Sequence, residues 1–91
     1  MKQYSEKIVK LEQTGAIKLL LFISKQGEAK TWELGRFSGV SQAAVYKAIP
    51  ILLELGLVEE VLDPPRRIFR LTEKGRRVLE KLMEVEAILS T

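Results

Sequence analysis

Two short stretches hold the side chains best suited to contact another molecule, and the first begins at Ser41. This serine is a strong helix N-cap candidate, because its hydroxyl can accept a hydrogen bond from a free backbone N–H two or three residues later. The first turn of a helix also presents unpaired N–H groups that attract phosphate. The residues that follow are polar or small, which would let a helix approach a surface closely: Gln42, Ala43, Ala44, Tyr46 and Lys47.

These residue types match the chemical groups of a DNA major groove. A glutamine can pair with N6 and N7 of adenine, a lysine can bind guanine or phosphate, and an alanine methyl can meet a thymine methyl. Tyr46 could stack on a sugar or bond a phosphate, with a place in the core as the alternative. The plainer alternative for the others is that Ser41 only caps the helix while Gln42 and Lys47 are solvated. We expect this segment to contact base edges or the DNA backbone.

The second stretch is a cationic turn. Arg66 and Arg67 directly follow Asp63-Pro64-Pro65, in which two prolines stiffen the chain and exclude a helix. Arg70 lies further along the strand expected after the turn. Arginines so placed can follow phosphates or enter a narrow minor groove, although surface arginines often serve only solubility. We expect all three to contact DNA.

Composition excludes several classes of protein. The 91 residues include no cysteine and no histidine, which removes disulfides, thiol chemistry, zinc ribbons and imidazole catalysis. Asp63 is the only aspartate, and the adjacent Glu59 and Glu60 would point to opposite faces of a strand. With no paired carboxylates, no glycine-rich phosphate loop and no activated nucleophile, we expect no enzyme, no metal site and no cofactor.

Charge and hydropathy bear on the partner and the location. The 15 basic and 12 acidic residues give a net charge of +3, so a monomer should bind DNA weakly. The longest apolar run, Leu19 to Ile23, is five residues and far short of a bilayer span. The N-terminal residues lack the apolar centre of a signal peptide. We expect a cytoplasmic protein with no membrane partner.

The first half of the chain is predicted to be mainly helical. A one-sided apolar stripe indicates a helix over about residues 3–12, and Thr14 is expected to cap an apolar core helix over 16–24. Residues 29–32 could form a short strand, and Thr31 could cap a short helix that ends near residue 37. We expect Trp32 to pack in the core or at a helix entry rather than to form a platform for a ligand.

The second half is predicted to add a helix, a hairpin and a final helix. The helix opened by Ser41 should run to about residue 55 and end at Gly56. Its core face is Val45, Ala48, Ile49, Leu52 and Leu55. Pro50 removes one backbone hydrogen bond and is expected to kink or split this helix. Strands over 57–62 and 67–71 should flank a turn at 63–66, and a helix should follow over 74–89.

Two motifs in this order resemble those of winged-helix transcriptional regulators of the MarR and PadR type. Residues 40–49 (VSQAAVYKAI) and 52–58 (LLELGLV) are similar to a recognition helix and its ending "L-x-x-x-G-L-[VI]". Residues 70–75 (RLTEKG) are similar to the step "x-L-T-x-x-G" from the second wing strand into the final helix. The resemblance covers residues 40–75. It implies one winged helix-turn-helix domain over 1–91, mainly α with a small β-hairpin and with extra N- and C-terminal helices.

The resemblance also implies a function. Such a protein is a sequence-specific double-stranded DNA-binding transcriptional regulator, with its recognition helix in the major groove and its wing on the adjacent minor groove or backbone. Family members can carry a pocket for a small-molecule effector, but nothing in the sequence identifies one. The alternative from another class is a winged helix that serves as a protein–protein interaction module in a transcription, replication or secretion assembly. Apolar residues in place of the wing arginines would have favoured that module.

The terminal helices carry more apolar surface than a small winged core can bury, which is typical of an interaction surface. Similar regulators use these helices to build a two-fold dimer that sets the recognition helices about one DNA turn apart. We therefore expect residues 1–13 and 76–91 to form a homodimer. The alternative is that the two helices pack on each other within one chain. The stripe residues are Tyr4, Ile8, Leu11, Val78, Leu82, Val85 and Leu89.

Overall fold

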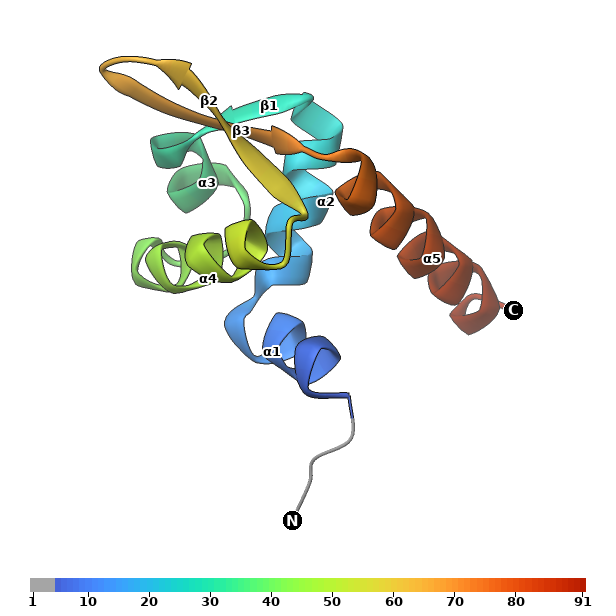
Figure 1. The fold of residues 1–91 in the computed structure, drawn as a ribbon. Helices are drawn as coiled ribbons and strands as arrows, with labels where there is room; N and C mark the ends of the chain where they lie inside the picture. The colour runs from blue at the N-terminus through green and yellow to red at the C-terminus, as the bar shows by residue number, and fades with distance from the viewer. Residues whose placement is uncertain (1–4) are drawn as a thin grey trace.

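The computed structural model describes residues 5–91 and confirms a mainly helical chain with a small antiparallel sheet (Figure 1). The hairpin projects from one side of the molecule, and α5 leaves from the other. Tyr4 lies outside the described residues. The elements are α1 (Glu6–Thr14), α2 (Ala16–Gln26), β1 (Glu28–Lys30), α3 (Thr31–Phe37), α4 (Gln42–Glu54), β2 (Val58–Asp63), β3 (Arg66–Leu71) and α5 (Glu73–Leu89).

The core forms where α2 meets α4 and the sheet. The largest fully buried side chains come from all of these elements and from α3: Leu19, Leu20, Ile23, Leu34, Val45, Leu52 and Phe69. Burial of such side chains is the main stabilising contribution in a domain of this size. The predicted core face of α4 is confirmed, because four of its five members are buried and Leu55 is half-buried. None of the helices in the described residues is both long and apolar enough to cross a membrane.

The sheet places β3 between β1 and β2, with both pairings antiparallel. The predicted short strand is thus present and adds a third strand to the hairpin. Asp63 pairs with Arg66, so the hairpin turn consists of Pro64 and Pro65 alone and is tighter than the four-residue turn predicted. This register sets Glu59 opposite Arg70. It also sets Glu60 diagonally opposite Arg67 on the same face, two residues along β2 from Leu62, the direct partner of Arg67.

Both ends of α4 agree with the sequence-based prediction. Ser41 caps the helix, since its Oγ accepts a hydrogen bond from the N–H of Ala44 at 3.2 Å. At the other end Gly56 has φ of 76°, and the N–H groups of Gly56 and Leu57 donate to the carbonyls of Leu53 and Leu52. This is the Schellman arrangement, which satisfies the last carbonyls of a helix. Pro50 lies within α4 without splitting it, contrary to one of the two outcomes expected.

The two motifs that suggested the family meet in one joint between α4, β2 and α5. Thr72 donates its hydroxyl hydrogen to the carbonyl of Gly56, and its oxygen accepts from the N–H of Gly75 at 3.0 Å. The N–H of Thr72 also donates to the carbonyl of Leu57 at 3.1 Å. Gly75 lies so close that a Cβ atom there would be 2.0 Å from the Leu57 carbonyl oxygen. This contact therefore explains why the motifs at residues 52–58 and 70–75 each place a glycine where they do.

Two local predictions are wrong, and the core alternative for Trp32 is wrong as well. Thr14 ends α1 instead of capping α2, because Gly15 adopts φ of 74° and turns the chain directly from one helix into the next. Thr31 is the first residue of α3, and the backbone N–H of Lys30 bonds the Glu33 carboxylate at 2.8 Å. The Thr31 hydroxyl is buried without a hydrogen-bond partner. Trp32 is 54% exposed, because the first turn of α3 lies at the surface beside the hairpin.

Candidate nucleic-acid interface

The N-terminal half of α4 presents the predicted contact residues on one exposed surface. Ser41, Gln42, Ala43 and Lys47 are exposed, and Tyr46 is 58% exposed, so the core alternative for Tyr46 is wrong. Ala44 is half-buried and packs against the core, which limits it to an edge of this surface. Helix N-terminal N–H groups and small side chains are thus available to a partner along the first turn and a half of α4.

Gln42 has a specific orientation that the sequence did not predict. Its side-chain amide lies over the backbone of Gly35 on α3, where an added Cβ would be 1.6 Å from the Gln42 Oε1 atom. A glycine at this point of α3 therefore lets the glutamine lie between the two helices of the pair. The amide is thus positioned by α3, and the glutamine as a whole is exposed.

Each of the three predicted hairpin arginines is paired with a carboxylate of β2. Arg66 bonds Asp63 at 2.8 Å, and Arg70 bonds Glu59 at 2.6 Å and lies 3.9 Å from Glu28. Arg67 makes two bonds to Glu60, at 3.0 and 3.2 Å. Its hydrogen bonds hold the pKa of the Glu60 carboxyl below the ordinary value, and those of Glu60 raise the pKa of Arg67. The hairpin thus carries three cations and three matching anions on its two strands.

A hollow of about 580 Å³ joins α3, α4 and the hairpin turn. It brings together four of the predicted contact residues, namely Gln42, Tyr46, Arg66 and Arg67. It adds residues that the sequence reasoning did not assign to the site: Lys30, Thr31, Trp32 and Pro65. Trp32 was missed because a lone tryptophan at a helix start is usually a packing residue; only its polar neighbours Lys30 and Glu33 hinted at exposure.

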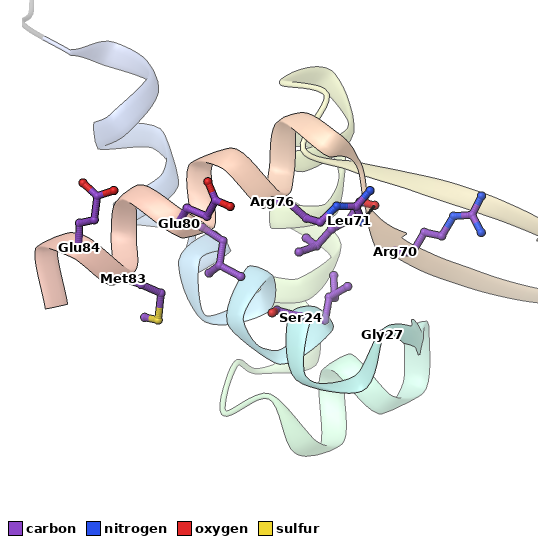
Figure 2. A pocket seen from close by; sticks show the side chains of 10 residues that line it. Ser24, Gly27, Arg70, Leu71, Arg76, Glu80, Met83 and Glu84 are labelled. Carbon is purple, nitrogen blue, oxygen red and sulfur yellow. Dashed lines mark hydrogen bonds between the residues drawn. The ribbon is translucent and has the colours of Figure 1, made fainter. Parts of the chain in front are cut away.

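Arg70 does not share this hollow. It lines a different one, of about 640 Å³, between the end of α2 and the middle of α5. Figure 2 shows Arg70 at one end of this second hollow, with Met83 and Glu84 at the other and Arg76 between them. The rest of its lining is Ile23, Ser24, Gly27, Leu71, Leu79 and Glu80. The structure thus separates Arg70 from Arg66 and Arg67.

The predicted dimerisation residues border an apolar groove of about 680 Å³ between α1, α2 and α5. Ile8 is 64% exposed, whereas Leu11 packs in the core of its own chain and only forms the floor of the groove. The alternative to a dimer was that α1 and α5 pack closely on each other within one chain. A groove lies between them instead. Three cations of α5 stand at its edge: Lys74, Arg77 and Lys81. Its apolar lining is Ile8, Leu11, Ile17, Val78, Leu82 and Val85, and Leu89 lies exposed beyond it.

The chain matches no protein-family model and no curated protein. It does match solved structures. A MarR family transcriptional regulator from Silicibacter pomeroyi DSS has a TM-score of 0.69 and 25% sequence identity, over 85% of this chain and 51% of that one. A probable transcriptional regulator from Pseudomonas aeruginosa has a TM-score of 0.67 and 26% identity, over 76% and 55%. A transcriptional regulator homologue from Pyrococcus horikoshii OT3 has a TM-score of 0.73 and 18% identity, over 89% and 85%.

The fold is a winged helix-turn-helix. In this winged helix, α3 and α4 are the helix pair, α4 takes the recognition position, and the β2–β3 hairpin is the wing. The predicted fold class is confirmed, including the helices added at each end. The chain spans about half the length of the first two structures. The first two are described as transcriptional regulators and the third as a transcriptional regulator homologue.

Proposed function

We propose that this winged helix is a DNA-binding transcriptional regulator that recognises a specific sequence of double-stranded DNA. The observation that carries the proposal is the position of the α4 N-terminal surface beside the wing turn. Gln42 and Tyr46 of α4 share one hollow with Arg66 and Arg67, so a groove and its adjacent backbone can be contacted together. The three similar solved structures described above are of transcriptional regulators or a homologue of one.

The proposed contacts divide by chemistry. Gln42, Lys47 and the methyl groups of Ala43 and Ala44 address base edges in the major groove. The Ser41 end of α4 and Tyr46 address phosphates. Arg66 and Arg67 address the minor groove or the backbone beside it. Arg70 lines the other hollow, away from the α4 surface, so we assign it no direct contact with this groove.

The proposed active species is a homodimer. The apolar groove at α5 and the exposed Val85, Ile88 and Leu89 form a surface that water would otherwise cover. A two-fold pairing through this surface would place two α4 helices on one face for a palindromic operator. It would also double the modest charge of +3, which strengthens phosphate attraction. We place the protein in the cytoplasm, where its DNA would be reached.

The test is fluorescence anisotropy of labelled random-sequence duplex DNA at several salt concentrations. We expect binding that falls steeply with salt, and the Arg66→Ala, Arg67→Ala double variant should weaken binding for all sequences and flatten the slope. Lys25→Ala, at the end of α2, is the matched control and should leave the slope nearly unchanged. If a folded dimer binds no duplex at low salt, the proposal fails and the protein-interaction module becomes the better hypothesis.

A further inference from the structure

We propose that the hollow between α3, α4 and the wing turn binds one unstacked nucleotide, with its base against Trp32 and Tyr46. This inference rests on the proposed function in one respect, since the nucleotide can belong to the DNA that the winged helix binds. It goes further by assigning to this hollow a ligand that a fully paired duplex does not supply, an unstacked base.

The first argument is the exposure of two aromatic rings in one concave place. Trp32 is 54% and Tyr46 is 58% exposed, and both line the hollow of about 580 Å³. Its volume is in the range of small-molecule sites, which span about 300–1,000 Å³. Exposed aromatic rings in nucleic-acid-binding proteins serve as stacking platforms for bases, because every base has a π-face. In a regular duplex both faces of each base are covered by neighbours, so only an unpaired or free base can stack here.

The second argument is the charge at the edge of the hollow. Lys30, Arg66 and Arg67 line it together with the rings, and no carboxylate does. The carboxylates that pair with the two arginines, Asp63 and Glu60, lie outside the lining. A phosphate at the mouth would therefore meet Lys30 and would compete with Asp63 and Glu60 for the two arginines, while the base lies against the rings.

The third argument concerns rigidity. Pro65 forms one wall, the Gly35 backbone positions Gln42 on another, and Trp32 is supported at 6.1 Å by the Phe37 ring in an edge arrangement. A site whose walls are fixed before binding loses less conformational entropy when the ligand arrives. Gln42 adds an amide that can hydrogen-bond the exposed edge of the base.

One chemistry can come from two sources: an unpaired base of bound DNA, or a free nucleotide. The experiment uses three probes, a labelled duplex with one unpaired adenine, its fully paired parent, and adenosine monophosphate. Trp32 is the only tryptophan of the chain, so its intrinsic fluorescence reports this hollow directly. We expect quenching by the bulged duplex or by the mononucleotide, and binding of the bulged duplex about 5- to 100-fold tighter than the parent, as stacking of one base predicts.

Variants separate this inference from the proposed function. Trp32→Ala and, independently, Tyr46→Ala should abolish the preference for the bulged duplex, while Trp32→Phe keeps most of it. Lys25→Ala, at the end of α2 and outside the lining, should leave the preference in place. Equal binding of bulged and paired duplexes without quenching overturns the nucleotide site but not the regulator. Quenching by the mononucleotide without any duplex binding supports the site and overturns the regulator. If folded Trp32→Ala binds both duplexes more weakly by the same factor, the preference for the bulged duplex is unchanged and the nucleotide site is overturned.

Discussion

Replacing Gly75 with alanine tests whether the joint between α4, β2 and α5 is as tight as it appears from its contacts. The new Cβ would lie 2.0 Å from the carbonyl oxygen of Leu57, and atoms at such contacts stay at least 3.0 Å apart, so the backbone must move by about 1 Å. That oxygen accepts the N–H of Thr72, and the movement would strain this bond as well. A backbone group cannot turn aside as a flexible side chain can, so we expect a net loss.

The magnitude follows from two opposing effects. Overpacking of this kind costs about 1–3 kcal/mol, and a backbone clash belongs at the upper end. Replacing a helical glycine by alanine returns less than about 1 kcal/mol in the first turn of a helix. The expected net loss is about 2 kcal/mol, which lowers the Tm of a domain this size by roughly 8–16 °C.

Gly35 is the matched control, because it also lies within a helix. Its added Cβ would meet only the side-chain amide of Gln42, which can rotate away. Gly35→Ala should therefore leave the free energy of unfolding unchanged or raise it by up to about 1 kcal/mol. Both variants are compared by thermal unfolding followed by circular dichroism at one protein concentration. A Gly75→Ala variant as stable as the wild type would refute the joint, and equal losses in both variants would refute the distinction between backbone and side-chain contacts.

Glu60→Gln removes the carboxylate that holds Arg67, so the affinity for duplex DNA should rise roughly two- to five-fold at low salt. The control is Glu84→Gln, which removes the carboxylate bonded to Lys81 on α5 and changes the net charge equally. An equal rise in both variants would show that only net charge matters. Because the pKa of Glu60 is lowered from 4.5, the stability difference between wild type and Glu60→Gln should be constant above pH 4.5 and shrink as the pH falls further; a difference that grows on acidification would contradict the ion pair. Val85→Lys should convert the proposed dimer to a folded monomer, as measured by light scattering. Leu62→Lys, at a wing position that is 88% exposed, should leave the dimer intact. A Val85→Lys variant that is still a dimer would exclude the α5 interface.

The parts of the fold that depend on neighbours in the chain could be predicted from the sequence. The core face of α4 followed from apolar spacing, and its two ends followed from the hydroxyl of Ser41 and the absent side chain of Gly56. The wing strands followed from the two prolines between them. Each of these signals acts within about five residues, so no knowledge of the tertiary structure was needed.

The details of the candidate interface depend on contacts between distant residues, and these were missed. The pairing of Arg67 with Glu60 follows from the cross-strand register, which the two-residue turn sets. The exposure of Trp32 follows from the place of α3 at the edge of the sheet, which no local pattern specifies. Arg70 lines another hollow for a similar reason, since α2 and α5, which are distant in sequence, form the rest of that hollow.

The joint at Thr72 and Gly75 has a consequence for the spacing of DNA half-sites. In the proposed homodimer, α5 of each subunit holds the partner, and α4 reads the DNA. The two helices are connected through the Gly56 and Leu57 carbonyls, with no flexible linker between them. The angle at which α5 leaves the domain therefore fixes the distance between the two recognition helices. A change of a few degrees at this joint would select a different operator spacing without altering any residue that touches a base.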